Sequence, residues 1–165
     1  MISAIDIPPQ SEISRHLNGA YYYDCYETAV KPTSQSALAL YLQVVAGTPG
    51  WINTLMALRN RVVSLVGLKN LGGLGDFDAT KPASDYRVGD RVGIFSIRYL
   101  SEQEVILGDT DKHLRVEVSV CRGQDKVAVS TVVHIHNLLG RVYMLFVVPM
   151  HRLIVPASLR NARFL

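Results

Sequence analysis

Two adjacent segments in which apolar and polar side chains alternate place the strongest constraint on the fold of this chain. The first, HLRVEVSVC, spans residues 113–121, and the second, KVAVSTVVHIH, spans residues 126–136. Such alternation is typical of paired β-strands, and the intervening RGQD indicates a tight turn. A one-residue slip would place apolar side chains opposite polar ones, so the pattern favours a register with Arg122 opposite Asp125. The expected pairs are Val120 with Val127, Val118 with Val129, Val116 with Thr131 and Leu114 with Val133.

The segment after this hairpin predicts a long apolar helix that packs back on the strands. Asn137 is a suitable N-cap residue, and residues 138–155 are strongly apolar. Pro149 and Pro156 lie within this segment, and a proline removes a backbone donor and clashes with the preceding turn. We therefore expect a kink or a break near residues 146–149.

The first part of the chain predicts a strand followed by a helix. Residues 1–20 show little periodicity and indicate an extended lead-in to the domain. Residues 21–30 are rich in aromatic and β-branched side chains, which favours a strand. A helix is expected at 35–46, with Thr33 or Ser34 as its N-cap and Gly47 at its end.

A second helix and a second hairpin follow. Residues 49–67 carry an apolar stripe at helical spacing, which we expect to face a sheet; it consists of Trp51, Leu55, Leu58, Val62 and Leu65. Residues 91–100 and 104–108 then predict two strands that turn at Ser101-Glu102. Pairing Leu100 with Gln103 places Ile97 opposite Ile106 and Tyr99 opposite Glu104. An exposed hairpin end is the favoured position for Glu104, and a buried acid is the alternative.

The composition narrows the class of protein. A chain of 165 residues predicts one domain over 1–165, and 48% hydrophobic with 19% charged residues excludes general disorder. The net charge of +3 is scattered and does not indicate a nucleic-acid partner. The most apolar run, 142–150, is shorter than the ~20 residues that cross a bilayer, so no membrane insertion is expected. Two cysteines without metal-ligand spacing, and no recognisable signal peptide, predict a cytoplasmic protein with reduced thiols.

The order of elements predicts an α+β fold, in which a curved antiparallel sheet grips one long C-terminal helix. This order is similar to the helix-grip fold of START-like and birch-pollen-allergen-like proteins. The sequence itself resembles a bacterial family known as domain of unknown function 2867. The matching phrases are PGWINTLMALRNRVVSLVGL (49–68), VGDRVGIF (88–95), LGDTDKHLRVEVSV (107–120) and TVVHIHNLLGRVYMLFVVPMHRLIV (131–155). The resemblance implies no reaction and no catalytic residues. Some members resemble C-terminal partners of a Rossmann-type oxidoreductase domain, whose GxxGxxG motif is absent here.

The register of the hairpin brings several potential metal ligands together. It places His113 opposite His134 and Asp111 opposite His136 on one face, and cross-strand neighbours have Cβ atoms ~4.5–5.5 Å apart. Imidazoles and a carboxylate suit zinc or a similar divalent metal. The favoured interpretation is nevertheless a solvent-facing side of the sheet, since Arg115 and Glu117 share that face, and no cofactor is expected.

His151 and Arg152 follow the expected kink at Pro149. The favoured interpretation is a pair on the helix surface. The alternative is that the kink turns one of them into the mouth of a cavity, where it could hold a ligand anion.

These observations favour a protein that binds a small hydrophobic molecule between the sheet and the long helix. The residues expected to line the cavity are Trp51, Met56, Phe95, Ile97, Tyr99, Tyr143, Phe146 and Met150. Tyrosine hydroxyls would orient the ligand.

Two other classes of function remain open. The first is an enzyme, such as a lyase, cyclase or hydrolase, that acts on a hydrophobic substrate with His113, His134 or Glu104 as acid or base. The second is an accessory domain that forms a homodimer or associates with an oxidoreductase, which an exposed apolar patch would favour.

Overall fold

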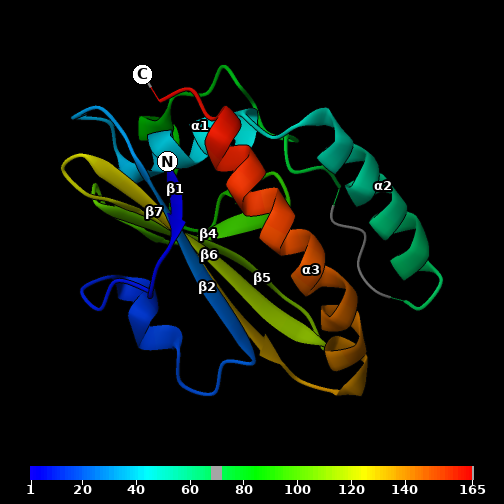
Figure 1. The fold of residues 1–165 in the computed structure, drawn as a ribbon. Coiled ribbons are helices and arrows are strands. Elements are labelled where there is room, and N and C mark those ends of the chain that lie inside the picture. Colours follow the sequence, from blue (N-terminus) through cyan, green and yellow to red (C-terminus); the bar gives the residue numbers. More distant parts are fainter. Residues whose placement is uncertain (68–71, 165) are drawn as a thin grey trace.

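The computed structural model describes residues 1–67 and 72–164, which form one antiparallel sheet with helices on one face (Figure 1). The sheet order is β1-β2-β7-β6-β5-β4-β3. The strands are β1 (Ile2–Ala4), β2 (Tyr22–Ala29), β3 (Arg91–Val92), β4 (Phe95–Leu100), β5 (Glu104–Thr110), β6 (Leu114–Arg122) and β7 (Lys126–Ile135). The helices are α1 (Ala37–Ala46), α2 (Gly50–Ser64) and α3 (Leu138–Asn161), with short 3-10 turns η1 (Glu12–His16) and η2 (Ala83–Asp85).

The hairpin of β6 and β7 has its predicted strands and faces, but the predicted register is wrong by two residues. Val120 pairs with Val129 and Val116 with Val133. The amide of Gly123 donates to the carbonyl of Lys126 (2.8 Å), so the two turn residues are Gln124 and Asp125 rather than the expected Gly123 and Gln124. A shift of two keeps every side chain on its face, because the side-chain period of a strand is two. The alternation therefore could not distinguish the two registers.

The register predicted for β4 and β5 is also wrong. Ile97 pairs with Leu107, and Tyr99 pairs with Ile106, with a bulge between Ile97 and Tyr99. The bulge inserts one residue, Arg98, into one strand only. The turn also lies one residue later than expected, at Glu102-Gln103, because the amide of Ser101 donates to the carbonyl of Glu104 (2.9 Å). Leu100 therefore pairs with Val105 rather than with Gln103, and Glu104 lies opposite Cys121 of β6.

Residues 1–20 are more than the expected extended lead-in. They contribute the edge strand β1, and η1 then lies against the outer face of the sheet, away from the helices (Figure 1). Ile13 of η1 is fully buried with Ile106 and Val132 of the sheet. Both faces of the central strands are therefore covered, which the sequence pattern alone did not indicate.

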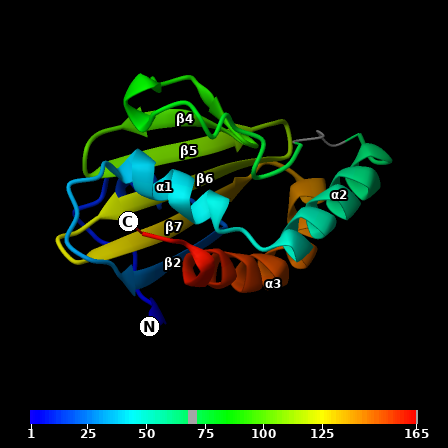
Figure 2. The same ribbon diagram turned by 90° about the horizontal axis from the view of Figure 1, so that it is seen from above.

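Helices α1 and α3 pack on the inner face of the sheet (Figure 2). Helix α1 begins two residues later than predicted, because Ser36 rather than Thr33 or Ser34 accepts the amide of Ala39 (3.2 Å), and it ends at Gly47 as expected. Helix α3 has the predicted cap, since the side chain of Asn137 accepts the amide of Gly140 (3.0 Å). The break expected near Pro149 does not occur, because helical structure continues from 138 to 161.

Helix α2 does not lie on the sheet as expected. It projects beyond the sheet, to one side of α3 (Figures 1 and 2). Ile52 and Val63 are buried, whereas four residues of the predicted inward stripe are exposed, namely Trp51, Leu58, Val62 and Leu65. The helical period shows which residues share a face, but it does not show that anything covers that face.

Helix α3 has the length and the apolar composition of a helix that could span a membrane. Among the described residues it is the one helix long and apolar enough to cross a membrane, with a hydropathy of 1.6 in its most apolar window. A helix packed in a soluble domain can pass the same test, and α3 contacts α1, β1, β2 and β7 here. The expectation of no membrane insertion stays a prediction.

Candidate ligand-binding cavity

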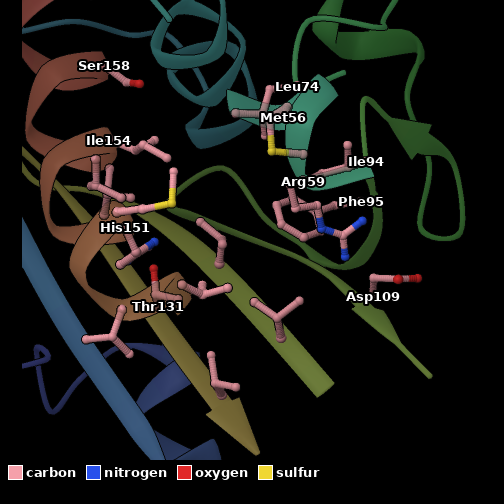
Figure 3. A pocket seen from close by; sticks show the side chains of 18 of the residues that line it. Met56, Arg59, Leu74, Ile94, Phe95, Asp109, Thr131, His151, Ile154 and Ser158 are labelled. Atoms are coloured by element: carbon pink, nitrogen blue, oxygen red, sulfur yellow. The ribbon is translucent and has the colours of Figure 1, made fainter. Parts of the chain in front are cut away.

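A cavity of about 250 Å³ lies between the inner face of the sheet and the three helices (Figure 3). Its lining is mostly aliphatic and comes from β2, β4, β6, β7, α1, α2 and α3. Strand β6 contributes Leu114, Val116, Val118 and Val120, and α3 contributes Met144, Val147, Val148, Ile154 and Val155. Alternation on the strand and helical spacing on α3 aim these side chains at the same space.

The cavity exists because the helices do not fill the space above β6. Val120 is fully buried near α1, whereas Leu114, Val116 and Val118 on the same inner face are only half-buried. Apolar side chains in a closely packed core would touch neighbours on all sides. The partial exposure of these three residues is therefore the packing signature of an unfilled interior.

The structure brings half of the predicted lining residues to this cavity. Met56, Phe95, Tyr143 and Met150 line it. The other four lie elsewhere. Ile97 is buried in the adjoining core, Tyr99 borders a second hollow on the outer face, and Trp51 and Phe146 are exposed. Phe146 is 70% exposed because it lies on the side of α3 that faces away from the sheet.

A polar cluster interrupts the apolar wall where β2 meets α3. Tyr22 donates its hydroxyl hydrogen to Asp24 Oδ2 (2.5 Å), and His151 Nε2 lies 3.2 Å from Asp24 Oδ1. Burial, and next the hydrogen bond to Asp24, raise the pKa of Tyr22 to about 12, so its hydroxyl keeps its hydrogen at neutral pH. Both Tyr22 and His151 line the cavity. His151 thus borders the cavity rather than forming a surface pair with Arg152, which is exposed.

Thr131 of β7 belongs to the same cluster. It pairs with Asp24 across β2 and β7 and with Val118 across β6 and β7, so it occupies the middle of the cavity floor. Its side chain is directed to the cavity close to His151 in Figure 3. It is 3% exposed, and within the described part of the chain its hydroxyl oxygen has no hydrogen-bond partner. Sequence reasoning missed this residue, although it is the one polar side chain in the alternating row from Val127 to Ile135.

A second polar group lies at the α2 side of the cavity. Arg59 Nε donates to the hydroxyl of Tyr143 (2.9 Å), and its guanidinium lies 5.4 Å from the centre of that ring. Asp109 and Asp111, at the end of β5, also border the cavity. The cavity thus has one polar cluster on its floor and another beneath α2.

The potential metal cluster does not form. Because of the two-residue shift in register, Arg115 rather than His113 lies opposite His134. His113 Nδ1 contacts the side chain of Asn137, while His134 Nε2 contacts the carbonyl of Asn18. The ring of His136 contacts the carbonyl of Asp111 through Nδ1 (3.2 Å). The described residues contain no group of three or more His, Cys, Asp or Glu placed to hold a metal ion.

Glu104 is buried rather than exposed at a hairpin end. Its carboxylate accepts the amides of Glu12 (2.5 Å) and Ile13 (3.1 Å) at the start of η1 and the hydroxyl of Ser119 (2.6 Å). Carboxylates commonly occupy this position at helix N-termini. Glu104 borders a polar hollow on the outer face but not the apolar cavity, and its hydrogen bonds serve to hold η1 on the sheet.

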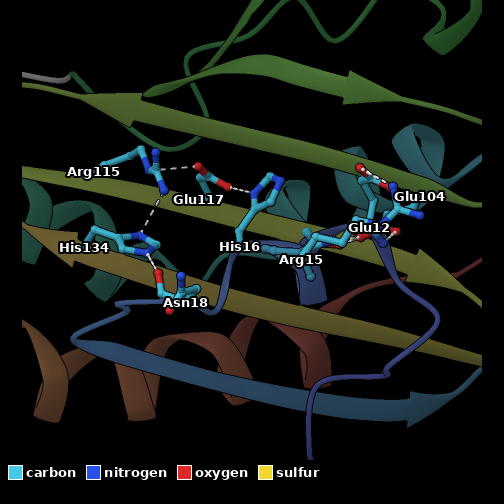
Figure 4. Close-up of polar contacts among 10 residues, drawn as sticks. Glu12, Arg15, His16, Asn18, Glu104, Arg115, Glu117 and His134 are labelled. Atoms are coloured by element: carbon cyan, nitrogen blue, oxygen red, sulfur yellow. Dashed lines mark hydrogen bonds and ion pairs between the residues drawn. The ribbon is translucent and has the colours of Figure 1, made fainter.

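A polar network continues along the outer face from η1 (Figure 4). His16 Nδ1 contacts Glu117 Oε2, and Glu117 Oε1 lies 3.1 Å from Arg115 Nε. Arg115 in turn contacts His134 (3.2 Å). The face that was expected to meet solvent is thus covered by η1, and Glu117 is only 8% exposed. Neither His113, His134 nor Glu104 lines the apolar cavity.

The comparisons with known proteins give a family but no activity. A family model described as a protein of unknown function, DUF2867, matches residues 16–158. No curated protein and no solved structure matches the chain. The match includes every strand from β2 to β7 and nearly all of α3. The chain therefore belongs to the DUF2867 family of proteins of unknown function.

Proposed function

We propose that this protein binds a small hydrophobic molecule in the cavity between the sheet and α3. The observation that supports the proposal is an unfilled space of about 250 Å³ whose walls are almost entirely apolar, with two small polar clusters. Ligand sites typically combine such walls with a few polar groups that fix orientation. The curved sheet and long terminal helix favour a helix-grip architecture, related to START-like proteins, and the free thiols are in keeping with the cytoplasm.

A matched pair of variants on α3 tests the proposal. Ile154→Trp adds an indole on the cavity side, whereas Leu153→Trp adds the same group on the exposed side, where Leu153 is 66% exposed. The probe is the uncharged dye N-phenyl-1-naphthylamine, whose fluorescence rises in apolar sites. We expect saturable binding by the wild type and Leu153→Trp, and binding at least tenfold weaker to Ile154→Trp. Circular dichroism checks that all three proteins are folded.

Equal probe binding by both tryptophan variants, both folded, would contradict the proposal. Native mass spectrometry after gentle purification gives a second test, because an adduct present in the wild type and absent from Ile154→Trp would identify the natural occupant of the cavity.

The enzyme alternative receives no support from its original candidates, since His113, His134 and Glu104 lie outside the cavity. The accessory-domain alternative is favoured by one observation, the exposed apolar side chains of α2 and α3. These two helices contain arginines but no acidic residue. A second copy would place like charges face to face, so we propose an acidic partner protein for this surface.

A further inference from the structure

The hydrogen-bonding capacity left open on the cavity floor indicates which kind of polar group a ligand carries. Both carboxylate oxygens of Asp24 already have partners, Tyr22 and His151. An ionised carboxylate only accepts hydrogen bonds, so His151 donates through Nε2. In the uncharged ring, Nδ1 is then an acceptor, and it makes no hydrogen bond within the described residues. Thr131, beside Asp24 in the sheet, has a hydroxyl that can both donate and accept.

The charges around this floor exclude some ligand groups. Asp24 places a negative charge beside the cavity. His151, which is a cation when it is protonated, is already paired with Asp24. Arg152 lies over the ring of Tyr22 at 6.0 Å, but its side chain is exposed to water. Among the described residues of this floor, a buried carboxylate or phosphate would therefore find no buried positive charge without a partner, and burying an uncompensated charge is costly. An uncharged group is the better match.

A hydroxyl satisfies both open positions, because it can accept from the Thr131 hydroxyl and donate to His151 Nδ1. We infer that the cavity takes a molecule with an apolar body and one uncharged hydroxyl, which Thr131 and His151 bind. The inference rests on the proposed ligand-binding function and adds the chemical class of the ligand and two residues that select it. The Thr131 hydroxyl oxygen is buried and has no hydrogen-bond partner among the described residues, and a ligand hydroxyl that reached it would supply one.

Three probes with one carbon skeleton test the inference: 4-phenylbutan-1-ol, 4-phenylbutanoate and n-butylbenzene. They are titrated against the wild type at pH 8, where imidazoles are ordinarily uncharged. Binding is followed by displacement of N-phenyl-1-naphthylamine. We expect the alcohol to bind about tenfold more tightly than the hydrocarbon, as one well-placed hydrogen bond allows, and the carboxylate to bind most weakly.

The variants Thr131→Val and Thr28→Val separate the hydroxyl from general packing effects. Valine keeps the shape of threonine and removes its oxygen, and Thr28 is a buried threonine of β2 outside the cavity. Thr131→Val should weaken the alcohol about tenfold and leave n-butylbenzene unchanged, and Thr28→Val should change neither. Weakening of alcohol and hydrocarbon by the same factor, or tighter binding of the carboxylate than of the alcohol, would overturn the inference while the cavity remains. If neither the dye nor any of the three probes binds, the proposed function fails as well.

Discussion

At the scale of single residues, burial keeps the thiol of Cys25 protonated. Cys25 on β2 is 1% exposed and receives a hydrogen bond from Ser130 (3.2 Å). Burial is the largest cause that raises the pKa of Cys25 to about 11 from an ordinary 9.0. The neutral thiol is favoured in the folded protein, so this group behaves as a small apolar side chain and not as a nucleophile.

Alkylation by iodoacetamide measures this effect in a Cys121→Ser background, where Cys25 is the remaining thiol. The folded protein should react with a rate that rises toward about pH 11, and the urea-unfolded chain with one that rises near 9. Between these values the unfolded thiol ionises first, so folding stability falls as the pH rises through this window. A folded-state rate that follows the unfolded profile would contradict the burial of Cys25.

At the scale of elements, the start of α3 depends on close contact with the β5–β6 turn. A Cβ added at Gly140 would lie 2.3 Å from the carbonyl oxygen of His113, closer than any real contact allows. By contrast, a Cβ at Gly50, the first residue of α2, would meet no atom within 4 Å. Glycine has the same intrinsic helix preference at both positions, but Gly140 is closely packed against the chain whereas Gly50 has open space around it.

The variants Gly140→Ala and Gly50→Ala test this difference. Alanine favours helix over glycine by roughly 0.5–1 kcal/mol, so Gly50→Ala should leave the free energy of unfolding unchanged or raise it slightly. Gly140→Ala should lower it by about 1–3 kcal/mol, because the backbone must shift to admit the methyl group. Urea unfolding followed by circular dichroism gives both values. A stabilised Gly140→Ala protein would show that α3 docks differently.

The elements also show which structure the sequence could predict. The faces of β6 and β7 and the cap at Asn137 follow from local chemistry, so they were predicted correctly. The register of the hairpin was wrong because a two-residue shift leaves the pattern unchanged. The cover formed by η1 depends on Glu104 accepting amides 91 and 92 residues away in the chain, which no local pattern encodes.

The same limit explains the cavity prediction. The expected lining included Tyr143, Phe146 and Met150 of α3, which lie three or four residues apart. Because α3 is apolar on nearly all sides, helical spacing could not show which of its rows faces the sheet. Tyr143 and Met150 lie inward and Phe146 outward. Thr131 was indistinguishable from any polar residue in a strand until the packing around it was known.

At the scale of the whole molecule, the apolar surface is divided between the cavity and an exposed side. The exposed apolar residues of α3 include Leu138, Val142, Leu145, Phe146 and Leu153. Soluble monomers rarely expose large contiguous apolar patches unless another surface binds there. These side chains contribute little to the free energy of folding, because they stay exposed to water in the folded protein.

The triple variant Leu145→Ser, Phe146→Ser and Leu153→Ser tests whether the exposed apolar residues of α3 contribute to folding or to binding in the cavity. The free energy of unfolding should change by no more than about 1 kcal/mol, and dye binding in the cavity should persist. Light scattering after gel filtration should show a monomer for both the wild type and the variant, since the arginines of two facing copies would repel. A wild-type dimer that the variant lacks would instead assign the surface to a second copy.

The two prolines inside α3 leave two gaps in the backbone hydrogen bonds of the helix beside the cavity. Proline has no amide hydrogen, so the carbonyls four residues earlier, at Leu145 and Arg152, receive no bond from Pro149 and Pro156. The stretch between these gaps contains Met150, His151, Ile154 and Val155, all of which line the cavity. We therefore expect this stretch to move more readily than the rest of α3, whereas the strands opposite are held by their ladder of hydrogen bonds.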